Sequence, residues 1–120
     1  MITGIHHVSI LASNEQSVAF YEKLGFEVTF RKDRAKDIIV LMDGYGMQIE
    51  MFIDASHPKR ACDPENLGLR HFALKTTDIE DIVHELEEKG ISCGDIGKDW
   101  TGIKYCYIED PDGLPIEVHE

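Results

Sequence analysis

Two segments of the sequence share one layout, and this repeat restricts the possible folds more than any other feature. The first reads HHVSILASNEQSVAFYEKLGFEV from His6, and the second reads HFALKTTDIEDIVHELEEKGISC from His71. Each starts with a half-apolar run typical of a strand and continues with helical spacing. Gly25 and Gly90 each follow their histidine by 19 residues, and glycine suits the left-handed conformation that ends a helix. Two copies of one strand-helix unit are the simplest explanation.

Both predicted helices have start signals. A capping residue follows each histidine by seven positions, at Ser13 and Asp78. Two sequences also fit the capping-box pattern, in which side chains satisfy the free amides of the first turn: Ser13-x-x-Gln16 and Thr77-x-x-Glu80. The second helix has its apolar side chains on one face, at Ile79, Ile82, Val83 and Leu86.

Three short strand-like segments follow each glycine. They span 27–31, 38–42 and 47–52 in the first half, and 91–93, 104–109 and 114–118 in the second. An Asp-Gly hairpin signal precedes the last strand of each half, at Asp43-Gly44 and Asp112-Gly113. The sequence therefore predicts an α+β fold made of two paired βαβββ modules.

We expect the two modules to form a single domain over residues 1–120. Module one spans about 1–56, a polar connector with two prolines spans about 57–67, and module two spans about 68–120. A half of roughly 55 residues buries too little surface to be stable alone. The modules are therefore predicted to pack as a pair.

Composition excludes several classes of partner. The formal net charge of −11, from 23 acidic and 12 basic residues, repels nucleic acid and anionic membrane surfaces. No segment is long and apolar enough to span a membrane, and no leader sequence is evident. Three distant cysteines without a C-x-x-C pair predict neither a disulfide framework nor a cysteine zinc site. We expect a cytoplasmic protein that binds a small molecule.

The repeat also pairs residues that can carry chemistry. Each module begins with a histidine, His6 or His71, and ends with a strand glutamate, Glu50 or Glu117, at intervals of 44 and 46 residues. If a pseudo-two-fold relates the modules, all four side chains can converge. Buried glutamates need a cation or a proton, and two nitrogens with two oxygens suit Ni, Co, Mn, Fe or Zn better than calcium.

Simpler interpretations compete with this one for each residue alone. A single histidine at a strand start is more often structural or exposed, whereas four residues matched across a repeat are harder to attribute to chance. His7 stays open as the ligand in place of His6, although it points to the opposite strand face. His119 could support Glu117 or be exposed. Lys104 and Trp100 could touch a substrate, or be an ordinary solvated lysine and a packing tryptophan.

These motifs resemble the vicinal oxygen chelate superfamily and, within it, the glyoxalase I-like (lactoylglutathione lyase) group. The matching stretches are GIHHVSILASNEQSVAFYEKLGF, QIEMF, GLRHFAL and DPDGLPIEVHE, which together cover nearly the whole chain. Aligning Phe20-Tyr21 with the family's helix favours His6 over His7 as the metal ligand. The resemblance implies a U-shaped mixed sheet around a metal cleft, and commonly a homodimer.

The resemblance also implies an activity. A glyoxalase I-like enzyme converts the hemithioacetal of methylglyoxal and a thiol to a lactoyl thioester, through a metal-stabilised enediolate. The implied metal ligands are His6, Glu50, His71 and Glu117, around one divalent ion, with Ni or Zn favoured over Co or Mn. Glu117 is expected to carry the proton, and Glu50 to act as a ligand that could also serve as the partner base.

Two departures from the family pattern concern the thiol. Glutathione-specific members have an arginine four residues after the first histidine and an asparagine four after the first glutamate, where this chain has Ile10 and Asp54. The loss of a cation and the gain of an anion disfavour binding of glutathione, which is an acidic tripeptide. We therefore expect another thiol. The alternatives are a related epimerase, an extradiol dioxygenase, which uses only three protein ligands, and a bleomycin-type resistance protein that sequesters its ligand without a metal quartet.

Overall fold

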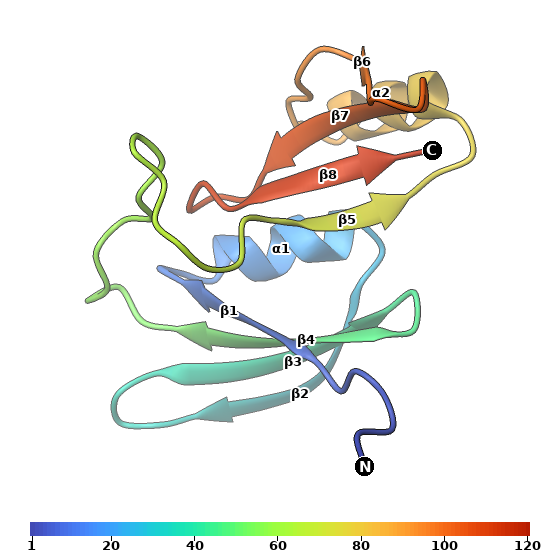
Figure 1. Ribbon diagram of the computed structural model, residues 1–120. Helices are drawn as coiled ribbons and strands as arrows, with labels where there is room; N and C mark the ends of the chain where they lie inside the picture. Colours follow the sequence, from blue (N-terminus) through green and yellow to red (C-terminus); the bar gives the residue numbers. More distant parts are fainter. The chain divides into compact units, whose positions relative to one another are not determined.

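The chain folds into two units with the same topology. The computed structural model describes all 120 residues, and the units comprise Met1–Pro58 and Lys59–Glu120. Each unit has one helix and one four-stranded mixed sheet (Figure 1). This confirms the predicted α+β class and the repeated βαβββ order. That the units pack as a single domain stays a prediction.

The first unit contains β1 (Val8–Ala12), α1 (Gln16–Lys23), β2 (Glu27–Asp33), β3 (Ile38–Gly44) and β4 (Met47–Ile53). Its strands are ordered β1-β4-β3-β2, with β1 parallel to β4 and the other pairs antiparallel. The first strand therefore lies beside the last, and the two ends of the repeated sequence meet at one edge of the sheet.

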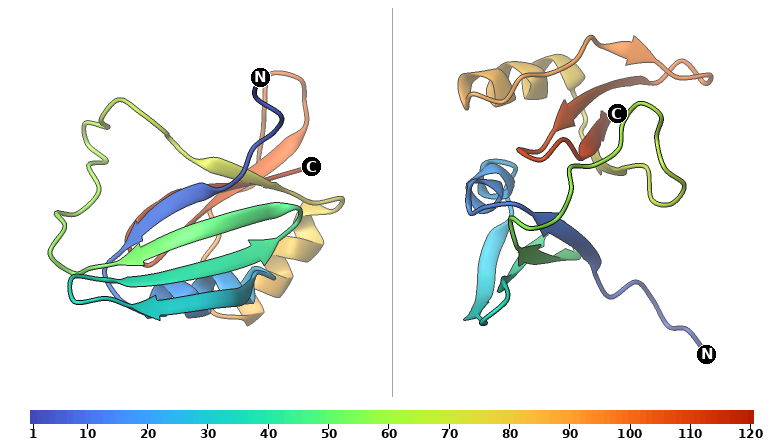
Figure 2. Two further views of the ribbon diagram at one scale, coloured as in Figure 1. Left: turned by 90° about the horizontal axis from the view of Figure 1, so that it is seen from below. Right: turned by 90° about the vertical axis from the view of Figure 1, so that its left-hand side faces the viewer.

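Alternation along the strands gives this sheet an apolar face and a mixed face. The alternating residues Ile49, Met51 and Ile53 of β4 are buried, whereas Glu50 and Phe52 between them are half-buried. Helix α1 supplies Phe20 and Tyr21 to the buried side. Figure 2 shows each helix along one face of its own sheet. Glu50 thus lies on the face opposite the core of its unit.

The second unit contains β5 (Phe72–Lys75), α2 (Ile79–Glu88), β6 (Gly97–Lys98), β7 (Lys104–Glu109) and β8 (Pro115–His119). Its strand order, β5-β8-β7-β6, reproduces that of the first unit, again with a parallel pair between the first and last strands. Ile116 and Val118 of β8 are buried, and Glu117 between them faces the other way. The expected core face of α2 is confirmed by burial of Ile79 and Leu86.

The helix ends match the predictions in part. Gly25 and Gly90 both have positive φ, and each amide bonds to the last helical turn, as expected for residues that end a helix. Asp78 caps α2, because its side chain accepts from the amide of Asp81. The Ser13 cap is wrong: α1 begins after Glu15, which makes no side-chain cap.

Two strand details differ from the predictions. The hairpin between β3 and β4 turns at Tyr45 and Gly46, both with positive φ, because Gly44 still pairs with Met47; the predicted Asp43-Gly44 turn is wrong. The predicted strand at 91–93 is also absent. Its apolar character comes from Ile91, which is buried after the helix, and the edge strand is Gly97–Lys98 instead. The Asp112-Gly113 turn is confirmed, since Gly113 has positive φ and its amide bonds to the carbonyl of Asp110.

Candidate functional site

A histidine and a glutamate lie side by side in the second unit. His71 directly precedes β5, and Glu117 lies in the middle of β8, which is paired with β5 in parallel. The Nε2 atom of His71 lies 3.0 Å from Oε2 of Glu117. Their side chains are 23% and 15% exposed, so this imidazole and carboxylate are partly desolvated yet still reachable. The sequence predicted this pair.

The first unit has a corresponding pair, built from β1 and β4. The Nε2 atom of His7 lies 3.5 Å from Oε1 of Glu50, with side chains 35% and 30% exposed. Glu50 is paired with Ser9 in the register of the sheet, just as Glu117 is paired with Ala73. Counting back two residues from each partner gives His7 and His71. The two pairs therefore hold equivalent positions in the repeat.

His6 lies next to this pair and not within it. It is exposed, its Nδ1 atom lies 2.8 Å from Nδ1 of His7, and it makes no ion pair with Glu50. Alignment of Phe20-Tyr21 with the family's helix favoured His6, in agreement with the equal spacing to Gly25 and Gly90. The helices differ in length, however: α1 has 8 residues and α2 has 10. The segment from the pairing histidine to the helix is one residue longer in the first unit, which makes up for one of the two missing helical residues. The spacing from that histidine to the closing glycine is therefore one residue shorter in the first unit, so equal spacing points to His6 in place of His7. His6 as a ligand stays a prediction, and the register favours His7.

The donor chemistry of the two pairs fits a transition metal. Each unit offers one imidazole nitrogen and one carboxylate oxygen, and the ion-pair partners of both carboxylates are histidines and never lysine or arginine. A divalent transition metal accepts this donor set readily. Within either unit alone, no three His, Cys, Asp or Glu side chains are arranged to hold a metal ion.

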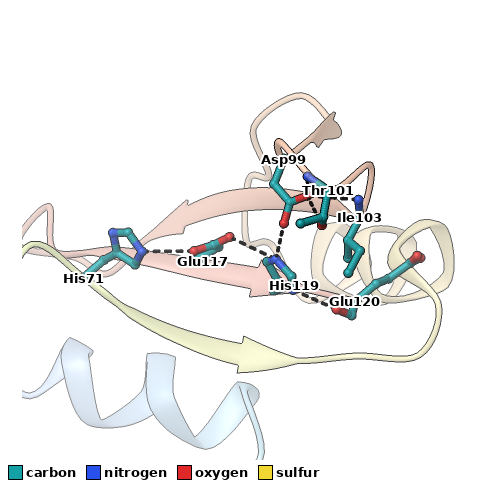
Figure 3. A network of polar contacts seen from close by, with 7 residues as sticks. All are labelled: His71, Asp99, Thr101, Ile103, Glu117, His119 and Glu120. Atoms are coloured by element: carbon teal, nitrogen blue, oxygen red, sulfur yellow. Dashed lines mark hydrogen bonds and ion pairs between the residues drawn. The ribbon is translucent and has the colours of Figure 1, made fainter.

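Glu117 has a second polar neighbour, shown in Figure 3. The Nε2 atom of His119 lies 3.9 Å from Oε1 of Glu117 and 3.1 Å from Oδ2 of Asp99, and Nδ1 lies 2.7 Å from the carbonyl oxygen of Glu120. The Glu120 carbonyl, followed by the Asp99 carboxylate, raises the pKa of His119. The hydroxyl of Thr101 contributes most to lowering the pKa of Asp99 to about 2.

Asp99 was not predicted from the sequence. Asp99 lies before the hairpin of β7 and β8, so neither strand nor helix periodicity links it to Glu117. The local sequence signal is the segment Asp99-Trp100-Thr101. An aspartate that accepts a hydrogen bond from the amide two residues later forms a common type of turn. The contact between Asp99 and His119 depends on the tertiary position of that turn.

Tyr107 lies beside Glu117 on the neighbouring strand β7. It is paired with Glu117 in the register of β7 and β8, and its ring packs edge-on against His71 with centroids 5.2 Å apart. Burial, followed by the negative charge of Glu117, raises the pKa of Tyr107. The sheet face around Glu117 therefore carries several groups that can bind or move protons.

The face around Glu50 is mainly apolar. Strand register places Ser9, Leu41 and Phe30 in one row with Glu50, and Leu11, Phe52, Ile39 and the edge-strand Lys32 in the next. Leu11 is 55% exposed and Phe30 is 49% exposed. The two units therefore present equivalent carboxylates in different surroundings, one apolar and one polar.

Lys104 and Glu120 have partners within the second unit, whereas Trp100 is exposed. Lys104 forms an ion pair with Glu80 of α2, with 2.7 Å between Nζ and Oε1. Trp100 is 95% exposed, so it does not pack as expected for a core tryptophan. Glu120, at the end of the chain, accepts from the amide of Ile79 at the start of α2. None of the helices has the length and hydropathy that a membrane span requires.

Known proteins share both the sequence pattern and the fold. The chain is 39% identical over 126 residues to "Uncharacterized protein YwkD" of Bacillus subtilis (strain 168), covering 100% of this chain and 98% of that protein. It superimposes on a glyoxalase family protein from Enterococcus faecalis with a TM-score of 0.92 and 43% identity, covering 98% and 97% of the two chains.

A more distant structure shows the same fold. Lactoylglutathione lyase from Agrobacterium tumefaciens has a TM-score of 0.73 and 22% identity, covering 99% of this chain and 94% of that one. The family model described as "Glyoxalase/Bleomycin resistance protein/Dioxygenase superfamily" matches residues 4–118. The chain therefore belongs to the glyoxalase/bleomycin resistance protein/dioxygenase superfamily, also called the vicinal oxygen chelate superfamily.

Proposed function

We propose that this protein is a metal-dependent isomerase of the glyoxalase I type. Its substrate is the hemithioacetal of methylglyoxal and a thiol, and its product is a lactoyl thioester. The observation that carries this proposal is the presence of two imidazole-carboxylate pairs at equivalent positions of the two units, His7 with Glu50 and His71 with Glu117. A ligand-sequestering resistance protein has no need of such a matched set.

The four side chains would together bind one divalent metal, with Ni or Zn the best candidates and Co or Mn as alternatives. When bound, the metal supplies Lewis-acid stabilisation to the two adjacent oxygens of the substrate. We take His7 as the ligand of the first unit because its Nε2 is the imidazole nitrogen near Glu50. We expect a homodimer in the cytoplasm, consistent with three free cysteines.

The isomerisation moves one proton between neighbouring carbons. A carboxylate takes the proton from the carbon that bears sulfur, and returns it to the former carbonyl carbon. The electron pair of the broken C–H bond first forms the C=C bond of an enediolate and then the new C–H bond. The hydroxyl on the sulfur-bearing carbon loses its proton and becomes the thioester carbonyl, while the former carbonyl oxygen gains a proton and becomes a hydroxyl, so no oxidant or reductant is needed. We assign this transfer to Glu117, which is less exposed than Glu50 and lies among polar groups. Glu50, in apolar surroundings, acts as a ligand.

The thiol is expected to lack the negative charges of glutathione. If His7 is the ligand, the position four residues later is Leu11, an exposed apolar side chain on the Glu50 face; if His6 is the ligand, it is Ile10, which is buried in the core. Neither offers a cation. Asp54, four residues after Glu50, accepts from the amide of Ser56 and lies near His57. A neutral or cationic thiol suits these surroundings better than an acidic tripeptide.

The test is thioester formation from methylglyoxal with a panel of anionic, neutral and cationic thiols, after adding Ni, Zn, Co or Mn to metal-free protein. The proposal predicts turnover with at least one non-anionic thiol, and its loss in Glu117→Gln. The matched control is Glu88→Gln, which alters an exposed carboxylate that also pairs with a histidine, His84. Metal binding without turnover for any thiol would instead favour an epimerase or dioxygenase of the same superfamily.

A further inference from the structure

His119 lies between two oxygen acceptors. Its Nδ1 atom is 2.7 Å from the carbonyl oxygen of Glu120, and its Nε2 atom is 3.1 Å from Oδ2 of Asp99. Both distances are within hydrogen-bond range. The ring is therefore held in place at both of its nitrogens.

Asp99 is held in position independently of His119. Its Oδ1 atom accepts from the amide and hydroxyl of Thr101, at 2.8 and 2.5 Å, and from the amide of Ile103 at 3.1 Å. These bonds close the turn that follows Asp99. The other oxygen, Oδ2, is left to face His119 (Figure 3). The turn thus presents a fixed negative charge to the imidazole.

The ring of His119, held in this way, lies beside Glu117. Its Nε2 atom lies 3.9 Å from Oε1 of Glu117, while Oε2 of the same carboxylate lies 3.0 Å from Nε2 of His71. One carboxylate oxygen therefore faces an imidazole that Asp99 holds in place, and the other faces the imidazole of His71.

The repeat shows that this arrangement is confined to one unit. Two residues after Glu50, the position equivalent to His119 is Phe52, whose ring lies 5.6 Å from the guanidinium carbon of Arg34 and bears no ionisable group. The two modules share an aromatic ring there, but only the ring of the second unit has nitrogens that can bond to a carboxylate. Glu117 therefore has an imidazole neighbour at a position where Glu50 has a phenyl ring.

We propose that Asp99 and His119 are positioning residues that orient the carboxylate of Glu117 for metal binding and proton transfer. In this role the Asp99–His119 pair acts through Glu117. The inference deepens the proposed function and rests on it for the identity of the metal site. Partners of this kind typically change metal affinity by about 10- to 100-fold.

Two variants change the Asp99–His119 pair without removing the hydrogen-bond acceptor that closes the turn. In Asp99→Asn the amide oxygen can still accept from Thr101 and Ile103, while the negative charge facing His119 is lost. His119→Phe introduces the residue type that the first unit has at the same position. The control is His84→Phe, which removes an exposed imidazole paired with Glu88 on α2. Unfolding midpoints identify any variant that fails to fold.

Two measurements decide the outcome. The first is the nitrogen NMR signal of the His71 ring in metal-free protein, which reports its contact with Glu117. Asp99→Asn and His119→Phe should shift it in the same direction as Glu117→Gln, whereas His84→Phe should leave it unchanged. The second is affinity for Ni or Zn by chelator competition, which should fall by about 10- to 100-fold in both variants but not in the control.

An unmoved His71 signal, or an unchanged metal affinity in both variants, would overturn the positioning role. If the wild-type protein binds neither metal, the proposed function fails. The His71 signal then decides alone whether Asp99 and His119 orient Glu117.

Discussion

The imidazole of His71 and the carboxylate of Glu117, 46 residues apart in the chain, lie with Nε2 and Oε2 at a distance of 3.0 Å. Parallel pairing of β5 with β8 brings the start of the second module beside its end. The same topology brings His7 to Glu50 in the first unit. A duplicated strand arrangement therefore creates two equivalent pairs of metal-type donors.

The two neighbouring histidines of the first unit should differ in their effect on metal binding. His7→Ala should lower the affinity for Ni or Zn by more than about 100-fold, which exceeds the usual effect of a residue outside the ligand set. His6→Ala should lower it much less, because His6 makes no contact with Glu50. Chelator competition measures both. A larger loss in His6→Ala would restore His6 as the ligand.

The two glutamates should differ in their effect on turnover. At saturating metal, Glu117→Gln should reduce kcat by about 10²- to 10⁴-fold, the usual contribution of a positioned proton carrier. Glu50→Gln should mainly weaken metal binding, so that excess metal restores more of its activity. Steady-state kinetics over a range of metal concentrations distinguishes them. Equal losses of kcat would contradict the division of roles.

Asp99 should stabilise the fold in a pH-dependent way. Its pKa is lowered from 3.8 to about 2, so the ionised form is favoured in the folded state. That stabilisation is fully present above the unfolded value and is lost as the pH falls through about 2. Urea unfolding of the wild type and Asp99→Asn should therefore differ most above pH 3.8. A difference that grows on acidification would contradict this.

The three cysteines should react at different rates. Cys62 is exposed, whereas burial followed by the nearby Cys106 raises the pKa of Cys93 to about 11. Burial also raises the pKa of Cys106. Because the thiolate is the reactive form, a disulfide reagent at neutral pH should modify Cys62 first. Mass spectrometry of partly labelled protein identifies the site, and early labelling of Cys93 would be the opposite result.

The helix caps should contribute unequally to stability. Asp78→Ala should lower the free energy of unfolding by about 1 kcal/mol, because the Asp81 amide loses its acceptor. Ser13→Ala should cost less, since α1 begins after Glu15. Denaturant unfolding of both variants provides the comparison. A greater loss in Ser13→Ala would show that Ser13 supports the start of α1 by another route.

The topology could be predicted from the sequence because its signals are local and occur twice. Apolar periodicity, the capping Asp78 and the closing glycines at 25 and 90 act within a few residues of the chain. A second copy at the same spacing made each weak signal stronger. The hairpin at Tyr45 was missed because tyrosine rarely adopts positive φ, whereas Asp43-Gly44 has the commoner turn sequence.

The site was only partly predictable. Glu50, His71 and Glu117 were selected because they match across the repeat, which the sequence reveals, and the structure brings each glutamate near a histidine. The choice between His6 and His7 depends on strand register, which is fixed by pairing with β4 and not by spacing to the next glycine. Asp99 depends on a turn that approaches His119 from outside the repeat pattern. The sequence therefore did not reveal the contacts between separate elements.

The most direct test is the metal content of the wild-type protein purified without an affinity tag, measured by elemental analysis beside the His7→Ala and His71→Ala variants. We expect about one divalent transition metal per chain in the wild type, because the proposed site takes two nitrogens and two carboxylate oxygens. Both variants should have much less. Wild-type protein that neither contains such a metal nor takes it up when Ni or Zn is added would contradict the central claim.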